Sequence, residues 1–354
     1  MTRILVIGGG IAGVSVAAKL APDADVTLLE TEAALGTHAS GRSAALFEEN
    51  YGTPTTCVLN RASRSEHERR GVLSPRGLMI VAKDSDRAQF ETDLIAMSMD
   101  EITVADALAR VPILNRDITR AAIHEDAHDI DTDKLLQGFA KDARASGANI
   151  ATRQKVIAIE RSTTWQVRTQ GQSFEADILV NAAGAWADQI AEMAGVARIG
   201  LQPNRRSMAR LPAPDGRDVG RWPMIIGPGE SWYAKPDAGG WIVSPAEEHP
   251  IEPMDAWPDD MVLAEGLDRY QKYVTSPVTR VETSWAGLRT FSPDRALVIG
   301  EDLDVSGFFW CAGQGGYGIQ SAPAASACLA DLVARRTPSL PAETVDGLSP
   351  ARFR

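Results

Sequence analysis

The chain has 354 residues and a formal net charge of −11 at pH 7. This length exceeds one ordinary hydrophobic core and indicates two domains. The acidic balance argues against nucleic-acid partners, because binding to a phosphate backbone needs clustered Lys and Arg, and no basic tail is present. No apolar stretch has the length of a membrane span, and the chain enters its first expected strand at Arg3 without a signal peptide, so we expect a cytoplasmic protein without a transmembrane segment.

Neither a disulfide framework nor a metal site is expected. The three cysteines, Cys57, Cys311 and Cys328, lack any C-x-x-C or Cys/His spacing and are expected to be buried thiols. His124 and His128 are four residues apart, but their flanks are acidic and no third ligand accompanies them. We therefore expect these histidines in a solvated loop.

The first strand and helix carry a glycine turn typical of dinucleotide-binding folds. Gly8 makes the tight turn, Gly10 lets a pyrophosphate approach the backbone N–H groups, and Gly13 lets the helix lie close to the strand. The start of that helix supplies hydrogen-bond donors and partial positive charge to phosphates. A second apolar run ends in Glu30, 17 positions after Gly13, where a carboxylate can accept hydrogen bonds from ribose hydroxyls. The alternative is a tight turn that binds no nucleotide.

The next two segments are less regular. Residues 36–45 are too rich in glycine and hydroxyl groups for a strand and indicate a second cofactor-binding loop. Residues 75–126 combine a short apolar strand at 78–81 with polar helical stretches.

A helix followed by a β-meander is predicted in the middle of the chain. Asp131 or Thr132 can cap the helix, and Gly147 can end it. Short β runs follow between residues 155 and 180, with a turn at Gly171. The apolar face expected for the helix consists of Leu135, Leu136, Phe139, Ala140 and Ala143.

Two further strand, glycine-turn and helix units follow, at residues 178–186 and 307–335, the second with a helix from Ile319 interrupted early by Pro323. Residues 201–285 are rich in Pro, Trp and short β runs, the composition of a separate, largely β domain. The expected fold class is therefore α/β, a Rossmann-like domain with an inserted, mainly antiparallel β domain. The expected boundaries are 1–74, 127–200 and 294–354 for the nucleotide-binding domain, and 75–126 and 201–293 for the substrate-binding domain.

Several longer motifs carry a family resemblance. The runs GGGIAG, THASGRSAA, LVNAAGAWAD, WAGLRTF and GFFWCAGQGGYGIQ resemble the D-amino-acid oxidase superfamily of FAD enzymes, which includes glycine oxidase and sarcosine oxidase. Within it, the runs NYGTP, DIDTD, GLQP, RRS and KPDAG are most similar to bacterial D-arginine dehydrogenase. The similarity spans nearly the whole chain.

The resemblance implies a two-domain flavoprotein of the GR2 type. Its expected reaction is hydride transfer from the α-carbon of a D-amino acid to flavin N5, giving an imino acid that water hydrolyses to a 2-oxo acid and ammonia. FAD is expected to be noncovalent, because Gly287 stands where monomeric sarcosine oxidase has the cysteine linked to its flavin. The residues implied to act on the substrate are Tyr51, Arg206, Tyr233, Arg289, Gly316 and Gln320. The residues implied to bind the cofactor are Gly8, Gly10, Ile11, Ala12, Gly13, Glu30, Arg42, Ser43, Ala44, Val156, Gly184, Trp186, Gly315, Tyr317, Gly318 and Ile319.

The chain departs from D-arginine dehydrogenase where the substrate side chain would lie. Leu78 replaces the acid that pairs with the substrate guanidinium, Leu46 replaces a lid histidine, and Glu48 replaces a nearby threonine. Losing a buried charge pair costs on the order of a few kcal/mol, so a neutral or apolar side chain is expected unless Glu48 binds a basic one. The residues expected to line this pocket are Leu46, Glu48, Leu78, Met224 and Ile226.

Three other functions are alternatives for such a sequence. An oxidase of glycine, sarcosine or another secondary amine would use the same scaffold and carboxylate clamp. An NAD-dependent dehydrogenase is disfavoured by the two later glycine-turn units and by the lack of a compact second nucleotide-binding half. A noncatalytic nucleotide-binding protein is disfavoured because the expected arginines and tyrosines are all present. The electron acceptor of the enzyme stays open between dioxygen, a quinone and another acceptor.

Overall fold

Two large β-sheets organise the chain, and the computed structural model describes residues 1–354. The first sheet has six strands in the order β20-β21-β13-β1-β2-β9, and only the β20–β21 pair is antiparallel. Except for the edge strand β9, its strands are short, mainly apolar and largely buried, as expected of a parallel sheet. They are β1 (Arg3–Ile7), β2 (Asp25–Leu29), β9 (Asn149–Ala151), β13 (Ile178–Asn181), β20 (Val298–Glu301) and β21 (Phe308–Ala312).

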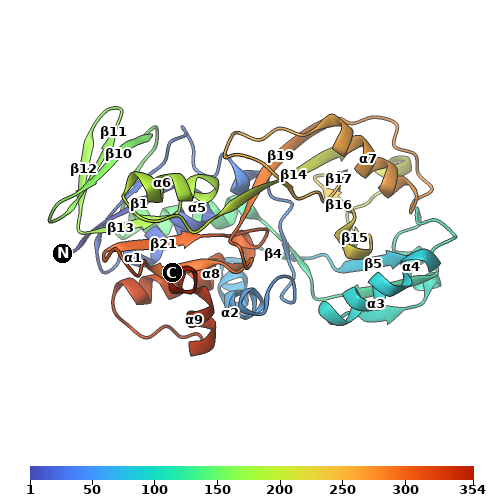
Figure 1. The fold of residues 1–354 in the computed structure, drawn as a ribbon. Coiled ribbons are helices and arrows are strands. Elements are labelled where there is room, and N and C mark those ends of the chain that lie inside the picture. The colour runs from blue at the N-terminus through green and yellow to red at the C-terminus, as the bar shows by residue number, and fades with distance from the viewer.

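Helices cover one face of this sheet and a small β-meander covers the other. Three helices share one core with the sheet: α1 (Ile11–Leu20), α5 (Thr132–Ala145) and α8 (Gly318–Val333). The opposite face packs against α6 (Ala187–Met193) and the antiparallel strands β10 (Val156–Arg161), β11 (Trp165–Thr169) and β12 (Ser173–Ala176). The predicted meander is therefore present, but the last of the predicted β runs, up to residue 180, forms β13 of the parallel sheet rather than its third strand. Figure 1 shows the meander at the outer end of this lobe.

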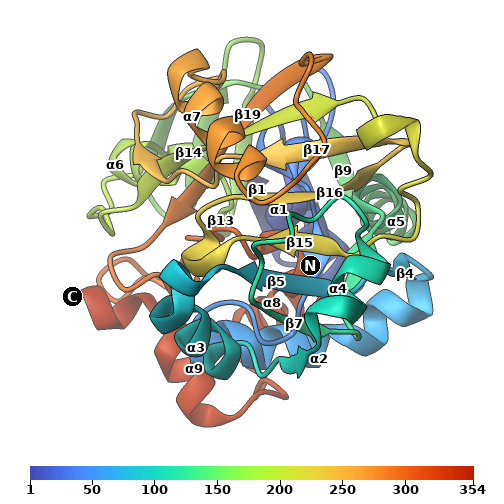
Figure 2. The same cartoon turned by 90° about the vertical axis from the view of Figure 1, so that its right-hand side faces the viewer.

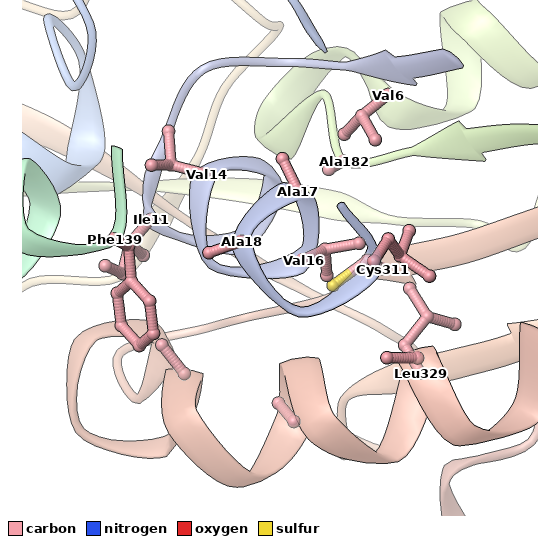
Figure 3. Packing of buried hydrophobic residues seen from close by; sticks show 14 of the residues in the cluster. Val6, Ile11, Val14, Val16, Ala17, Ala18, Phe139, Ala182, Cys311 and Leu329 are labelled. Carbon is pink, nitrogen blue, oxygen red and sulfur yellow. The ribbon is translucent and has the colours of Figure 1, made fainter. Parts of the chain in front are cut away.

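Small side chains let α1 lie at the centre of the helical layer. Ala17 and Ala18 are buried between the sheet and the neighbouring helices, and Figure 3 shows Phe139 of α5 and Leu329 of α8 around the same helix. Gly13 is required here, because a Cβ at this position would lie 1.9 Å from the carbonyl oxygen of Gly8. The sequence interpretation of Gly13 as the residue that permits close packing agrees with this geometry.

The predicted α5 helix is confirmed at both ends. The Asp131 side chain accepts a hydrogen bond from the Lys134 N–H at 2.9 Å and caps the first turn. Gly147 follows the last turn with φ of +91°, a conformation that glycine adopts without strain. The five residues predicted for the apolar face are all buried.

The prediction of a helix interrupted at Pro323 is wrong, because α8 continues through that residue. A proline inside a helix disturbs the hydrogen bonds of the preceding turn. Side chains from α2 (Pro54–Arg70) compensate: His67 Nε2 donates to the Gln320 carbonyl at 2.8 Å, and Ser63 Oγ donates to the Ser321 carbonyl at 3.2 Å. Contacts between distant segments therefore keep the helix continuous.

The second lobe is built on a nine-stranded sheet in the order β18-β14-β17-β16-β15-β5-β7-β6, with β19 paired to β14. Its pairs are antiparallel except β5 with β15. Figure 2 looks onto β15, β16 and β17 beside β5 and β7. The strands are β5 (Leu78–Ala82), β6 (Asp100–Ile102), β7 (Arg120–His124), β14 (Gln202–Leu211), β15 (Met224–Ile226), β16 (Tyr233–Asp237), β17 (Gly240–Ser244), β18 (His249–Pro250) and β19 (Thr283–Phe291).

Shorter elements complete the fold. A three-stranded sheet in the order β3-β8-β4 consists of β3 (Leu46–Phe47), β8 (His128–Ile130) and β4 (Leu73–Pro75). The remaining helices are α3 (Arg87–Ala96), α4 (Val104–Arg110), α7 (Asp260–Gln271) and α9 (Ala342–Leu348). None of the helices combines the length and the apolar character needed to cross a bilayer. The exact domain boundaries stay a prediction.

Candidate active site

The three glycine turns predicted from the sequence meet at one edge of the six-stranded sheet. β1, β13 and β21 are adjacent, and Ile7, Asn181 and Trp310 lie in register at or near their carboxyl ends. In open α/β sheets, ligands bind in the crevice outside this edge. The tertiary structure thus places turns that are far apart in sequence around one candidate cofactor site.

The residues of the first turn fit the phosphates and ribose of a dinucleotide. Gly8 has φ of +112°, and a Cβ there would lie 2.3 Å from the Ala182 carbonyl oxygen. Gly10 is the N-cap of α1 and supplies no side chain to cap the helix, and the Ser40 hydroxyl accepts the Ile11 N–H at 2.9 Å. A start of a helix without its own cap is a site where a phosphate can bind. The Glu30 carboxylate accepts the N–H groups of Gly9 and Glu32 at 2.6 and 2.7 Å, which fixes it beside the turn. Ile11 and Ala12 form the first turn of α1.

Further predicted cofactor residues lie around this edge. Val156 begins β10, two residues after Gln154, whose N–H donates to the Glu30 carbonyl at 2.8 Å. Gly184 and Trp186 belong to a short 3-10 turn after β13, and the Trp186 ring lies 4.9 Å from that of His38. This places aromatic surface beside the cofactor-binding edge.

The second predicted cofactor loop reaches across to the other lobe. The Arg42 guanidinium donates to the carbonyls of Ala256 and Ala286 at 3.0 Å and pairs with Asp255 at 2.5 Å. Its donors are therefore already engaged by protein groups, and its contact with a pyrophosphate stays a prediction. Ser43 and Ala44 line the pocket described next.

The turn before α8 contributes to the same wall. The Gly315 N–H donates to the Thr290 carbonyl at 2.8 Å, which ties this turn to β19. Tyr317 and Gly318 lead into α8, and Ile319 faces the pocket. The Tyr317 ring packs edge-on against the Tyr51 ring at 5.3 Å.

A pocket between the two lobes collects most of the residues predicted to meet the substrate. Tyr51, Tyr233, Arg289, Gly316 and Gln320 all line it. So do the five residues predicted for the side-chain pocket. Its complete lining is Ser43, Ala44, Ala45, Leu46, Glu48, Tyr51, Leu78, Met97, Met224, Ile226, Glu230, Tyr233, Arg289, Gly316, Ile319 and Gln320.

The two predicted arginines project from one face of the paired strands β14 and β19. Arg289 is opposite Asn204, two residues from Arg206, so both arginines lie on the same side of the sheet. The adjacent Arg205 points to the other side and pairs with Asp259 at 3.3 Å. Figure 1 shows the two strands running side by side.

Glu230 was not predicted from the sequence, yet it joins these arginines. Its carboxylate accepts from Arg206 Nη1 at 2.7 Å, from the Tyr51 hydroxyl at 2.8 Å and from Arg289 Nη1 at 3.4 Å. Its backbone has φ of +54°, which a side chain rarely adopts and which aims the carboxylate inward. The available signal was an acid in a Gly-Pro turn directly after Ile226.

Burial and charge together set the ionisation of this cluster. Burial favours a neutral Glu230, but Arg206 and Arg289 outweigh it and hold the pKa of its carboxyl below the usual range. Burial and the adjacent Glu230 raise the pKa of Tyr51. Burial opposes the charge on Arg289, but Tyr51 and Glu230 raise its pKa. With Tyr51 neutral, two cations and one anion leave a net charge of +1.

A second buried carboxylate, Glu48, corrects the expectation for His124. Glu48 Oε2 lies 2.6 Å from His124 Nδ1, and the Glu48 side chain is only 2% exposed. His124 is therefore half-buried and ion-paired rather than in a solvated loop, because β7 carries it to the domain interface. His128 lies on a different strand, β8, and its Nδ1 bonds to the Asp126 carbonyl. No group of three or more His, Cys, Asp or Glu side chains could hold a metal ion.

Comparisons with known proteins identify the family. The family model described as FAD dependent oxidoreductase, DAO, matches residues 3–332. FAD-dependent oxidoreductase domain-containing protein 1 of Xenopus laevis is 26% identical over 189 residues, which cover 46% of this chain and 36% of that protein. The alignment thus spans about a third of that relative's length. Glycine oxidase of Geobacillus kaustophilus is 23% identical over 363 residues, covering 94% of this chain and 93% of the relative.

The fold is also that of solved flavoprotein structures. L-proline dehydrogenase from P. horikoshii superimposes with a TM-score of 0.84 and 23% sequence identity, covering 99% of this chain and 97% of that one. The predicted α/β fold class, the expected FAD cofactor and the resemblance to the superfamily are thereby confirmed. Because the family match extends over nearly the whole chain, the protein belongs to the DAO family of FAD-dependent oxidoreductases.

Proposed function

We propose that this protein oxidises the α-carbon to nitrogen bond of a D-amino acid that carries one carboxylate. The proposal rests on the hydrogen bonds that the Arg289 guanidinium makes and on those it leaves unmade. Its Nη1 bonds to Tyr51 and Glu230, while its Nε and Nη2 make no hydrogen bond within the protein. The guanidinium therefore keeps two parallel donors for a carboxylate, the arrangement that suits arginine.

The charge of the arginine cluster supports a substrate with a single carboxylate. Arg206, Arg289 and Glu230 sum to +1. Glu248 also pairs with Arg206, but Arg295 balances its charge. One substrate carboxylate therefore neutralises the site, and a second would be left without a partner. The Tyr233 hydroxyl has only the weak acceptor Met208 Sδ, at 3.3 Å. It can exchange that contact for a bond to the substrate carboxylate at little cost.

The residues around Gly316 suit the reacting end of the substrate. FAD, when bound, supplies the acceptor for the hydride that leaves the α-carbon. The Gly316 carbonyl can accept a hydrogen bond from the substrate amine. Gln320 Oε1 accepts the Glu48 N–H at 2.9 Å, which orients the side chain and leaves its amide N–H groups free in the pocket. Together with the arginine cluster, these contacts fix the orientation of the α-carbon.

The walls of the pocket favour an apolar substrate side chain. Leu78 and Ile226 are buried in the same cluster as Tyr233, and Met97, which the sequence did not predict, adds further apolar surface. Leu78 stands where the resemblance to D-arginine dehydrogenase requires an acid. Preference for a neutral or apolar side chain is therefore part of the proposal.

Anaerobic bleaching of the purified holoenzyme tests the proposal. D-leucine and D-phenylalanine are expected to bleach the flavin faster than D-lysine and D-arginine, and the L-enantiomers are expected to leave it oxidised. Arg289→Met should abolish bleaching at substrate concentrations that saturate the wild type. Arg205→Met is the matched control, because that arginine points to the opposite face of β14. A lack of bleaching by every D-amino acid would contradict the proposal, and a strong preference for D-arginine would contradict the apolar pocket.

Oxidation of glycine or a small secondary amine is a second candidate. It is favoured by the similarity to glycine oxidase of Geobacillus kaustophilus over 94% of this chain. Adding glycine and sarcosine to the same panel separates the two. Faster bleaching by either than by D-leucine would favour this candidate.

A further inference from the structure

The Glu48–His124 ion pair lies at the end of the sheet remote from Arg289. His124 ends β7, and five strands, β14, β17, β16, β15 and β5, separate β7 from β19, which carries Arg289. Arg289, Leu78 of β5 and Glu48 nevertheless line one pocket, so a substrate whose carboxylate binds Arg289 can extend its side chain toward Leu78 and Glu48. The ion pair is placed to meet the end of that side chain.

The strand register places His124 on the face of the sheet that carries the pocket, one strand beyond Leu78, so His124 meets the pocket through Glu48. Met224 of β15 is paired with Leu78 of β5, and Leu78 is paired with His124 of β7. Residues paired across strands point to the same face of a sheet. Met224 and Leu78 line the pocket, so His124 belongs to the same row. Figure 2 shows β15, β5 and β7 lying next to one another.

Glu48 reaches this row from the other lobe and is held in position. Its backbone N–H donates to Gln320 Oε1 at 2.9 Å, and its Oε1 accepts the Asn50 N–H at 3.0 Å. Each carboxylate oxygen has a second acceptor position. Glu48 lines the pocket, so it can accept one more hydrogen bond from a ligand without releasing His124.

We propose that Glu48 and His124 together recognise the end of the substrate side chain, and that the charge on His124 decides whether a neutral or a cationic end is preferred. This inference rests on the proposed function. With His124 protonated the Glu48–His124 pair is neutral overall. An uncharged substrate side chain can then enter the pocket without leaving a charge unpaired. With His124 neutral, Glu48 is an uncompensated buried carboxylate, which favours a cationic end.

The surrounding charges favour the protonated form of His124. The hydrogen bond to Glu48 is the main cause that raises the pKa of His124, and Asp126 and Glu49 act in the same direction. Arg64 of α2 pairs with both Glu49 and Asp126, so those two acids are partly compensated.

Two further groups on α2 and one ion pair between α4 and the residue after β7 complete these surroundings. Burial raises the pKa of the Cys57 thiol, while Arg61 acts to lower it and Glu48 to raise it. Glu125, adjacent to His124, pairs with Arg110 at 2.7 Å. Glu48 is therefore the only carboxylate among these neighbours that His124 itself contacts.

The test compares D-lysine with D-norleucine, which have the same chain length and differ by the terminal ammonium. We expect the kcat/KM ratio of D-lysine to D-norleucine in the holoenzyme to rise about tenfold or more between pH 6 and pH 9, mainly through KM. His124→Asn should give a ratio that is high and independent of pH, and Glu48→Gln a ratio that is low and independent of pH. His128→Asn is the control, because that ring bonds to a backbone carbonyl on another strand and should keep the wild-type profile.

The outcomes separate the two proposals. A ratio that stays flat in the wild type, or that rises equally in His124→Asn, overturns the role of the ion pair while D-norleucine oxidation still supports the proposed function. If neither amino acid is oxidised, both proposals fail. Binding of 6-aminohexanoate and hexanoate to the wild-type holoenzyme, followed by the flavin absorbance, gives a second measurement that needs no variant. A pH-independent affinity ratio for these two carboxylates overturns the inference as well.

Discussion

Replacing Glu230 by glutamine tests the charge balance of the arginine cluster. The variant keeps the length of the side chain but removes its negative charge. Arg206 then retains only Glu248 as an ionic partner, at 3.3 Å, and Arg289 retains none. The amide group of glutamine also brings N–H donors toward guanidinium donors, so the hydrogen bonds of the carboxylate are not fully replaced.

The expected loss of unfolding free energy depends on how far the Glu230–Arg206 ion pair is exposed to solvent. Breaking a fully buried ion pair by removing one partner costs about 3–5 kcal/mol. The side chains of Glu230 and Arg206 are 27% and 4% exposed, so solvent screens part of the interaction and we expect about 2 kcal/mol. For a protein of this size that corresponds to a decrease in Tm of about 3 °C.

Thermal unfolding of the holoenzyme with and without acetate provides the assay. Acetate can bind the uncompensated arginines and stabilise the folded state by mass action. Its effect on Tm should therefore be larger in Glu230→Gln than in the wild type. Glu265→Gln, at an exposed position of α7, is the control. An unchanged Tm in Glu230→Gln, or an equal acetate effect in both proteins, would refute the charge balance.

Three further predictions concern other contacts. Arg289→Lys keeps the charge but loses the parallel donors, so kcat/KM for D-leucine should fall about 100-fold in steady-state assays; a loss below about threefold would argue against bidentate binding. Asp129→Asn leaves the buried Lys235 without a counterion, and urea unfolding should show a loss of about 3 kcal/mol, whereas an unchanged midpoint would contradict this. Burial lowers the pKa of His67, so the unfolded chain binds its proton first and wild-type stability should fall as the pH drops below about 6.5. His67→Gln should show a smaller decrease in Tm between pH 7 and pH 5, and equal decreases would rule out this contribution.

Local sequence patterns predicted the parts of the fold that depend on neighbouring residues. The Asp131 cap and the apolar face of α5 follow from residue spacing within one helix, and the meander follows from short β runs separated by turns. The structure contains all three. The roles of Gly8 and Gly13 also follow locally, because the absence of a Cβ is required wherever the backbone is crowded. Family motifs extended these predictions to Arg289 and to the rest of the pocket.

The partners of the buried charges could be found only from the tertiary structure. Glu48 and His124 are 76 residues apart, and Tyr51 and Glu230 are 179 apart. A glutamate reads the same in the sequence whether its carboxylate is exposed to solvent or buried in an ion pair. Which of the two occurs depends on the strand that the fold brings beside it. The sequence alone determined the individual glycine turns, because such turns act through their own backbone. Only the folded chain decided which acid meets which cation, because that depends on strand order and on how the two lobes close over the pocket.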